Sequence, residues 1–212
     1  MVDADGEQAL GITELVAQIE RDARDRRRYV FGLAGPPGSG KSTVAARLAE
    51  ALRGVVVPMD GFHLDNAELD RLGLLAVKGA PETFDAAGFV RLVERLVHAD
   101  GPVSVPSFDR VADCTVDAAI TVAADDRIVI VEGNYLLLDR PPWTALAGMF
   151  DRTGYIDVDD ATRVERLVDR HVRHGRALDD AREFVRRSDG ANAAVIAVTR
   201  SRADVLVDPS RP

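Results

Sequence analysis

YVFGLAGPPGSGKST, residues 29–43, is the stretch of sequence that decides the fold. Residues 35–42 fit the pattern G-x-x-x-x-G-K-[ST], in which glycines let the backbone wrap around phosphate oxygens at a helix N-terminus. The apolar run at residues 29–34 predicts a strand before the loop. The apolar stripe of a helix follows the loop, at Val44, Ala45, Leu48, Ala49 and Leu52. This context favours a phosphate-binding loop over the alternative, a Gly-rich turn with no ligand.

The residues of this loop have predicted roles at a nucleoside triphosphate. Lys41 supplies a point charge that can follow a phosphoryl group, and the Ser42 hydroxyl can hold Mg²⁺. The pattern does not say what happens to the phosphate. The predicted nucleotide-binding residues of the loop are Gly35, Pro36, Pro37, Gly38, Ser39, Gly40, Lys41, Ser42 and Thr43.

Length and composition set limits on the class of protein. With 212 residues and 46% hydrophobic content, we expect a single α/β domain over residues 1–212. The net charge of −8 argues against a broad nucleic-acid or anionic-membrane surface. Cys114 is the only cysteine, which excludes an intramolecular disulfide and a Cys-based zinc cluster. Residues 1–7 are acidic and lack the apolar core of a signal peptide, and no apolar run is long enough to span a bilayer, so we expect a soluble cytoplasmic protein.

Lysine is rare in this chain. Only two of the 27 basic residues are lysines, Lys41 and Lys78. A chain so biased toward arginine should keep lysine where a guanidinium does not serve, and Lys41 in a phosphate cradle is such a place. The same argument singles out Lys78, for which an ordinary surface lysine is the alternative.

The rest of the chain alternates between helical and strand patterns. Helices are expected over residues 8–28, in a short segment through Leu69, Leu72 and Leu75, after an Asp85 N-cap, after an Asp159 N-cap and over residues 179–201. Further strands are expected at residues 55–59, 103–105, 115–122, 128–131, 155–158 and 203–207. Such alternation predicts a parallel sheet with right-handed crossovers and a ligand site at the carboxyl ends of its strands.

Two carboxylates directly follow apolar strands, as the phosphate loop does. Asp60 follows residues 55–59 and Glu132 follows residues 128–131. In an open parallel sheet these positions converge on one crevice. Asp60 is the predicted catalytic base that accepts a hydroxyl proton, and Glu132 is predicted to bind magnesium or to act as a base. The alternative for each is a carboxylate that caps a neighbouring helix.

Arginines recur on one face of the helix after Asp159. Arg163, Arg166, Arg170 and Arg173 share that face, and Arg176 follows the Gly175 turn. A solvated helix face is the usual explanation, but the mobile turn before Arg176 favours a phosphate-binding lid over about residues 163–190. We predict a catalytic role for Arg173, nucleotide contacts for Arg170 and Arg176, and an acceptor contact for Arg166. The inward face of this helix is expected to carry Val164, Leu167, Val168 and Val172.

In combination, these segments resemble a known family. Residues 29–207 are similar to the P-loop kinase group that contains uridine/cytidine kinase, phosphoribulokinase and bacterial pantothenate kinase. Within that group, the sequence resembles small bacterial proteins described as nucleoside/nucleotide kinase-family or fructose-transport-system kinases.

Particular segments carry the resemblance. Residues 59–63 (MDGFH) resemble the segment that holds the family's catalytic base, and residues 131–133 match its second acidic strand end. Residues 78–85 are similar to a stretch typical of pantothenate kinases, and residues 106–109 resemble the Pro-x-Tyr-Asp acceptor segment. Two departures put the acceptor in doubt: His174 replaces the first arginine of the usual Arg-Gly-Arg, and Phe108 stands where uridine kinases carry tyrosine.

The resemblance implies a fold and an activity. The fold is a three-layer P-loop NTPase fold, nucleoside/nucleotide kinase-like, with a central parallel sheet and a helical lid. The activity is transfer of the ATP γ-phosphoryl group, with Mg²⁺, to a hydroxyl of a small metabolite such as a nucleoside, pantothenate or a sugar. Neither a nucleic acid nor a membrane is an expected partner, and a homodimer is left open. The predicted acceptor-binding residues are Asp60, His63, Lys78, Phe108, Asp109, Arg110, Glu132 and Arg166.

Two other functions stay open at this point. The first is a GTPase switch or regulatory ATPase, although the chain lacks any Asn-Lys pair and so lacks the Asn-Lys-x-Asp motif common in guanine-specific GTPases. The second is a non-catalytic nucleotide-binding module, for instance a regulator of a transporter. Asp60, Lys41 and Glu132 together argue against it without excluding it.

Overall fold

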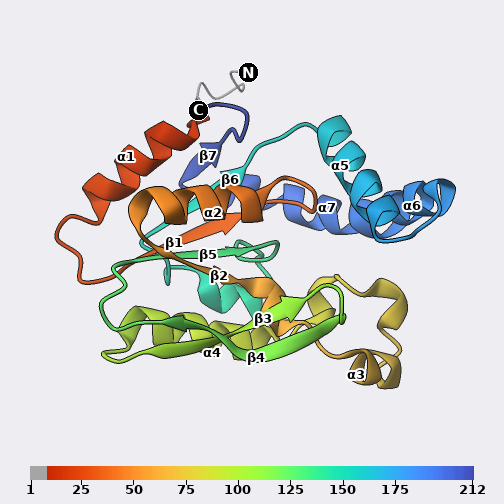
Figure 1. Cartoon of the computed structure of the whole chain (residues 1–212), viewed down its shortest axis with the longest axis horizontal. Coiled ribbons are helices and arrows are strands. Elements are labelled where there is room, and N and C mark those ends of the chain that lie inside the picture. The colour runs from red at the N-terminus through yellow and green to blue at the C-terminus, as the bar shows by residue number, and fades with distance from the viewer. Residues whose placement is uncertain (1–8) are drawn as a thin grey trace.

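A computed structural model of the chain describes residues 9–212; the predicted acidic N-terminal segment at residues 1–7 lies outside that range. Its centre is a five-stranded parallel sheet in the order β2-β5-β1-β6-β7 (Figure 1). The strands are β1 (Tyr29–Ala34), β2 (Val55–Pro58), β5 (Ile128–Gly133), β6 (Arg152–Ile156) and β7 (Val205–Val207). The predicted α/β class and parallel sheet are confirmed.

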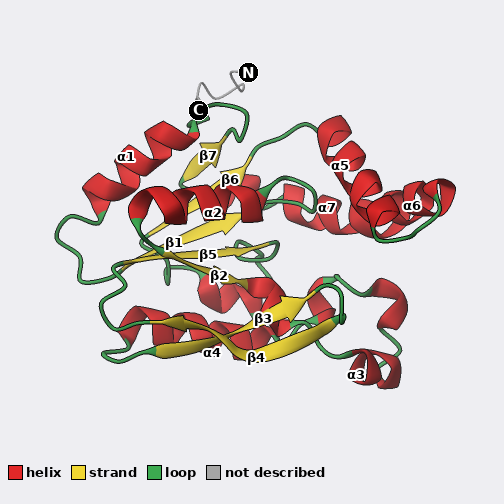
Figure 2. Cartoon of the chain, in the orientation of Figure 1, coloured by secondary structure: helices red, strands yellow, loops and turns green. Residues whose placement is uncertain are grey.

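Helices cover both faces of the sheet, which gives three layers (Figure 2). Every residue of β1 and β5 is buried, as expected for central strands whose neighbours lie on both faces. On one face, α1 (Ile12–Asp22) and α2 (Lys41–Leu52) pack against one set of alternating strand residues. On the other face, α4 (Ala86–His98) and α7 (Gly190–Ala197) contribute to a second core that contains Trp143.

Two strands lie outside this sheet. β3 (Val103–Asp109) and β4 (Cys114–Val122) form an antiparallel hairpin of their own, with a register shift between Val105 and Ser107. The sequence predicted residues 106–110 to lie between two short strands, and this is wrong for most of that segment, which is the second half of β3. The hairpin turn is stabilised by Asp109, whose carboxylate accepts hydrogen bonds from the amides of Val111 (2.8 Å) and Ala112 (3.0 Å).

The first predicted helix is shorter than expected. Residue 8 lies outside the described residues, and α1 ends at Asp22, so residues 24–28 are not helical. Arg28 lies in this non-helical segment, and its guanidinium donates to the carbonyls of Leu96, Ala123 and Asp126. It thereby ties the start of β1 to the last turn of α4 and to the loop between β4 and β5.

The helix after Asp159 begins where predicted, but its packing differs from the prediction. Asp159 accepts a 2.8 Å bond from the Thr162 amide and so caps α5 (Asp160–Arg173), and Gly175, at φ +91°, follows the helix. Val164 and Val172 were expected to face inward, but 43% and 40% of their surfaces are exposed. Leu167 is buried as predicted, and the other buried position is taken by Arg163, which donates to the Pro37 carbonyl at 3.0 Å.

The expected helix over residues 179–201 is interrupted. It consists of α6 (Leu178–Phe184), a π-helical turn at Val185–Asp189, and α7, with a separate 3₁₀ turn at Arg200–Arg202. Two other predicted elements are shorter than expected. A 3₁₀ turn begins at Met59, the last residue of the predicted strand, and the short helix predicted through Leu75 is α3 (Asn66–Arg71) followed by a separate 3₁₀ turn at Leu75–Val77. A π turn inside a helix is frequent at functional sites, because it re-aims side chains by one position.

Candidate active site

The carboxyl ends of three neighbouring strands carry the residues of one cavity. β5 lies between β1 and β2, with Ala34 in register with Gly133 and Pro58 in register with Glu132. The phosphate loop follows β1, and Asp60 follows β2. A cavity of about 650 Å³ forms where they meet, lined by Lys41, Asp60 and Glu132 among others. The convergence expected for an open parallel sheet is therefore present in this molecule.

The phosphate loop has the close packing that its glycines allow. Gly38 has φ +77°, and a Cβ atom there would lie 2.7 Å from the Arg163 carbonyl oxygen and 2.8 Å from Leu167 Cγ. The Lys41 ammonium donates to the Pro36 carbonyl at 3.1 Å. The hydroxyl of Ser39 is buried and has no hydrogen-bond partner among the described residues. The glycines let the backbone of this loop come close to a ligand, and a cradle of this shape fits a phosphate group.

The charges beneath the loop are buried and opposed. Lys41 and Glu132 are 8% and 7% exposed. Burial lowers the pKa of Lys41 to about 8, although the carboxylates of Glu132 and Asp60 act in the opposite direction. Burial likewise raises the pKa of Glu132, and Lys41 opposes that shift. Burial destabilises the charged form of each group, so a ligand of opposite charge would stabilise it: a phosphate for Lys41 and a cation for Glu132.

The donor set around Glu132 fits magnesium. The Ser42 hydroxyl donates to Glu132 Oε1 at 2.9 Å, which brings the oxygen atoms of these two side chains together at the edge of the cavity. Mg²⁺ prefers oxygen ligands and is usually held by one or two protein groups plus substrate phosphates and water. Within residues 9–212 no group of three or more His, Cys, Asp or Glu side chains could hold a metal by itself. Ser42 and Glu132 therefore suit a metal that arrives with a triphosphate.

Asp60 faces this cavity from the opposite side. It lies in the 3₁₀ turn Met59–Phe62, and its side chain is 30% exposed. Arg110, at the tip of the β3–β4 hairpin, places Nη2 2.6 Å from Asp60 Oδ2. Both residues line the cavity. The hairpin therefore supplies the charged partner of the predicted base.

Aromatic rings line the cavity near Asp60. The His63 ring stacks on Phe84, with centroids 4.0 Å apart, and lies 5.0 Å from the Phe108 ring. His63 Nδ1 is buried and has no hydrogen-bond partner within the described residues. Burial lowers the pKa of His63 to about 4, so the ring is neutral at pH 7.

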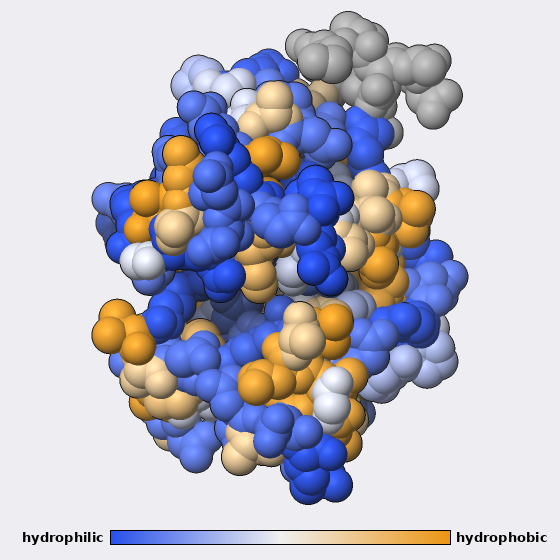
Figure 3. All heavy atoms as spheres, turned by 90° about the vertical axis from the view of Figure 1, so that its right-hand side faces the viewer, coloured by the Kyte–Doolittle hydropathy of each residue, from blue (hydrophilic) through white to orange (hydrophobic). Residues whose placement is uncertain are grey.

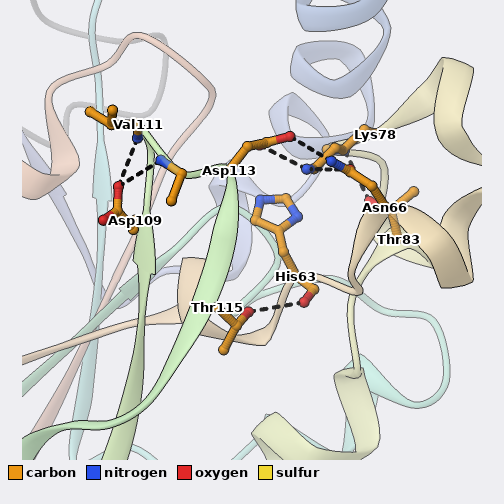
Figure 4. Close-up of polar contacts among 10 residues, drawn as sticks. His63, Asn66, Lys78, Thr83, Asp109, Val111, Asp113 and Thr115 are labelled. Carbon is orange, nitrogen blue, oxygen red and sulfur yellow. Dashed lines mark hydrogen bonds and ion pairs between the residues drawn. The ribbon is translucent and has the colours of Figure 1, made fainter.

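Lys78 lies beside these aromatic rings and lines the same cavity. Its ammonium donates to Asn66 Oδ1 at 2.7 Å and to Asp113 Oδ1 at 2.8 Å, and it lies 5.3 Å from the Phe108 ring centroid. These bonds join the start of α3, the loop after Leu75–Val77 and the tip of the hairpin, as Figure 4 shows. Lys78 lines the cavity rather than the outer surface.

The lid arginines divide by what they contact. Arg166 donates to the Ser39 carbonyl at 3.3 Å, and Arg166, Arg170 and Arg173 all line the cavity. No hydrogen bond from the Arg170 guanidinium is found among residues 9–212, and burial and the nearby Arg110 lower the pKa of that guanidinium. Arg176 is not among the lining residues; its guanidinium lies 4.2 Å from the Phe184 ring centroid.

Some of the predicted site residues do not line the cavity, and some residues that were not predicted do. Asp109 does not line the cavity, because its carboxylate is bound to the backbone of the hairpin turn. Gly35, Pro36 and Ser39 belong to the loop without lining the cavity. The lining residues that sequence reasoning missed include Phe84, Asp113, Asn134, His171, Phe184, Asp189 and Asn192. His171 Nε2 lies 3.0 Å from Asp189 Oδ2, which ties α5 to the π turn.

A comparison with protein-family models matches residues 30–211 to the phosphoribulokinase / uridine kinase family. The chain belongs to this family. Membership supports an ATP-dependent kinase activity and ATP binding for this chain.

Curated relatives agree with this assignment. The YggC protein of Escherichia coli K12 is 35% identical over 204 residues, which cover 93% of this chain and 84% of that protein. The pantothenate kinase of Nocardioides sp. is 33% identical over 169 residues, which cover 73% of this chain and 51% of that enzyme. The chain thus matches about half of the pantothenate kinase.

Solved structures show the same architecture. A protein from Silicibacter sp. TM1040, described as a "putative fructose transport system kinase", has 41% identity and a TM-score of 0.87 over 93% of this chain and 98% of that one. The fold of phosphoribulokinase from Rhodobacter spheroides aligns with a TM-score of 0.62 over 85% of this chain and 69% of that one. The predicted P-loop kinase fold is confirmed. Within the described residues, no helix is both long and apolar enough to cross a bilayer.

Proposed function

We propose that this protein transfers the γ-phosphoryl group of ATP to a hydroxyl of a small metabolite. The observation that carries the proposal is the placement of Asp60 and Lys41 on the same cavity, at the ends of different elements. A kinase of this type needs a cradle for the triphosphate, positive charge on the transferring group, and an acceptor for the hydroxyl proton. All three requirements have candidate residues in one 650 Å³ cavity.

The proposed reaction is an in-line displacement. The acceptor hydroxyl oxygen forms a bond to the γ-phosphorus while the bond from that phosphorus to the β,γ-bridging oxygen breaks, and ADP leaves. The hydroxyl proton passes to Asp60. Lys41 and Arg170 stabilise the negative charge that spreads over the transferring group, since Lys41 is buried, Arg170 is half-buried, and neither side chain has a carboxylate partner in hydrogen-bond contact.

Ser42 and Glu132 would hold magnesium beside the phosphates, where the ion neutralises charge on the β- and γ-phosphate oxygens. Arg173 and Arg166 extend the positive surface along α5, in the roles predicted for the lid. A lid that covers the phosphates also keeps water from the γ-phosphorus, which limits wasteful ATP hydrolysis.

The acceptor is proposed to lie between Asp60 and the aromatic wall. His63, whose ring is neutral at pH 7, lines the cavity together with Phe84 and Phe108 and offers the acceptor an uncharged surface. Lys78 and Arg110 offer further donors, although each now pairs with a carboxylate. A polar acceptor with several hydroxyl or amide groups suits this wall better than an aliphatic alcohol does.

ADP release with and without candidate acceptors tests this function. We expect Mg²⁺- and acceptor-dependent ADP release by the full chain, screened with nucleosides, pantothenate, ketoses and related alcohols. ADP release that does not depend on any acceptor would instead favour a switch-type or regulatory ATPase. Tight ATP binding with no ADP release under any condition would favour a non-catalytic nucleotide-binding module.

A further inference from the structure

A second cavity adjoins the catalytic cavity, and the proposed reaction does not use it. It has a volume of about 600 Å³ and lies between the 3₁₀ turn Leu75–Val77 and the lid segment that ends in α7. Figure 3 shows this side of the molecule, which is hollowed between two masses that both carry apolar side chains. The apolar residues that line the cavity are Ala76, Val77, Ala80, Phe184 and Ala191. Its size is that of an ordinary small-molecule site.

The two cavities meet at a neck. Phe184 and Asn192 line both of them. The loop beside them passes from one cavity to the other, because Lys78 and Gly79 line the first and Ala80 lines the second. Consecutive residues of one loop therefore connect the acceptor end of the catalytic cavity with the apolar cavity.

The neck is lined by Gly79, which has no side chain to fill it, and the loop that contains this glycine is fixed by hydrogen bonds. Gly79 has φ +100°, and a Cβ atom there would lie 3.5 Å from Asn192 Nδ2, so the glycine leaves this space free. The hydroxyl of Tyr135 donates to the Gly79 carbonyl at 2.5 Å, and the Gly79 amide donates to Thr83 Oγ1 at 2.9 Å. These bonds fix the loop from behind. Asn192 is 8% exposed, and its amide has no hydrogen-bond partner among the described residues.

The rim of the second cavity has no net charge. Arg176 and Arg187 line it together with Asp180 and Glu183, which makes two cations and two anions. Glu183 is also the partner of basic side chains on its own helix segment, including Arg187 at 3.9 Å. A balanced rim above an apolar floor gives no preference for a charged group and favours an uncharged, largely apolar one.

We infer that the second cavity binds the non-reacting arm of an elongated acceptor. This inference rests on the proposed function, since it places the reacting hydroxyl at Asp60. The polar middle of the acceptor passes Lys78 and the free amide of Asn192 in the neck, and an uncharged apolar arm fills the space between Val77 and Ala191. The substrate class is therefore an alcohol with a polar head and an apolar tail, longer than a simple polyol.

A homologous series of alcohols tests this assignment. The probes are N-methyl-, N-butyl- and N-hexyl-4-hydroxybutanamide, which share one primary hydroxyl and one amide and differ only in the tail. Their dissociation constants are measured on the full chain with Mg²⁺ and a non-hydrolysable ATP analogue. We expect affinity to rise with tail length, by up to about fourfold for each methylene that becomes fully buried.

Two matched variants locate the effect. Ala191→Trp places an indole in the second cavity from an exposed position of α7, and it should abolish the dependence on tail length. Ala194→Trp adds the same side chain at another exposed position of α7 that lines neither cavity, and it should leave the dependence unchanged. Equal affinity for the three tails overturns the inference, as would a tail dependence that survives Ala191→Trp. Equal affinity is also the result expected if the second cavity binds no part of the acceptor and is only filled by protein side chains when the lid moves.

ADP release measured with the same alcohols, with ATP in place of the non-hydrolysable analogue, separates this inference from the proposed function. Tail-dependent binding, with no ADP release for any alcohol, would contradict the kinase proposal and support an arm-binding site. ADP release with short alcohols, combined with equal affinity across the series, would support the kinase and contradict the arm-binding site.

Discussion

The guanidinium of Arg110 lies 2.6 Å from the carboxylate of Asp60, across 50 residues of sequence. Asp60 follows a strand of the central sheet, whereas Arg110 is at the tip of a hairpin outside that sheet. The contact fixes the orientation of the proposed base before any acceptor is bound. An acceptor hydroxyl that reaches Asp60 must share or replace this partner, so the hairpin takes part in acceptor binding.

The first prediction concerns Asp60 itself. Asp60→Asn keeps the shape of the side chain and removes its ability to take up a proton. Turnover should fall by at least about a hundredfold, the scale of a lost general base, while ATP affinity stays within a few fold. Steady-state kinetics and a binding titration with an ATP analogue provide the two numbers. Near-normal turnover would remove Asp60 from the proposed role.

Lys78 gives a second prediction, on the acceptor side. Lys78→Ala removes the ammonium that bonds to Asn66 and Asp113, so the acceptor wall loses both a donor and a link between its loops. The acceptor KM should rise about tenfold or more, as expected for loss of a charged hydrogen bond, with little change in the KM for ATP. Arg91→Ala is a matched control, because Arg91 has a 4.0 Å ion pair on the surface and lines no part of the cavity. An effect confined to ATP would assign Lys78 to the donor side.

The third prediction concerns magnesium. Ser42→Ala and Glu132→Gln each remove one of the oxygen donors that we assign to the ion. Both should raise the Mg²⁺ concentration that gives half-maximal activity, whereas Ser42→Thr keeps the hydroxyl and should change it little. A magnesium titration at fixed ATP provides the measurement. An unchanged magnesium requirement in both variants would contradict the assignment.

A fourth prediction follows from the lowered pKa of Lys41, which is about 8 in the protein without ligand. A triphosphate favours the charged amine and raises that pKa, so ATP binding should take up a proton above pH 8. Affinity should therefore be highest below pH 8 and fall as the pH rises through 8. Calorimetry in buffers of different ionisation enthalpy gives the proton count directly. Lys41→Met, which has no amine, should bind ATP weakly and show no such pH dependence.

The lowered pKa of Lys41 also makes the stability of the folded chain depend on pH. The pKa of Lys41 is lower in the folded chain than its ordinary value of 10.5, so between about 8 and 10.5 the unfolded chain holds more protons. The contribution of Lys41 to the free energy of unfolding should therefore increase with pH across that range. Comparing the urea midpoints of wild type and Lys41→Met from pH 7 to 10 isolates this contribution.

The fifth prediction concerns the shape of the phosphate loop. Gly38 and Gly73 have similar backbone angles, φ +77° and +71°, but only at Gly38 would a Cβ atom meet other atoms within 4 Å. Gly73→Ala should cost about 1 kcal/mol from the left-handed backbone alone. Gly38→Ala should cost more and should also weaken ATP binding, because the loop has to shift away from Arg163 and Leu167. Equal thermal shifts for the two variants, with ATP binding intact, would mean that the loop tolerates the methyl group.

The sequence was most informative where chemistry imposes a local pattern. The glycines and Lys41 of the phosphate loop, and the acids that follow apolar strands, could be found because backbone conformation and strand polarity leave a mark over a few residues. The sequence was less informative where long-range packing decides. Val164 and Val172 look like core residues on a helical wheel, yet Arg163 occupies the buried position because the Pro37 carbonyl is there to accept its bond.

Residues that reach the cavity from irregular elements were also hidden. Asn192 and Asp189 lie in what reads as one continuous helix, and only the π turn at Val185–Asp189 breaks its regular periodicity there. Asp113 lies at a hairpin tip with φ +53° and reaches Lys78 across 35 residues. No short sequence signal distinguishes these positions from ordinary surface residues.

The most direct measurement follows the label of [γ-³³P]ATP in the presence of Mg²⁺ and a panel of alcohol metabolites. We predict that the wild-type chain moves the label into an organic phosphate for one class of alcohol, and that Asp60→Asn nearly abolishes this product while it still binds ATP. Label that appears only as inorganic phosphate, with the same yield whether or not an alcohol is present, would contradict the central claim.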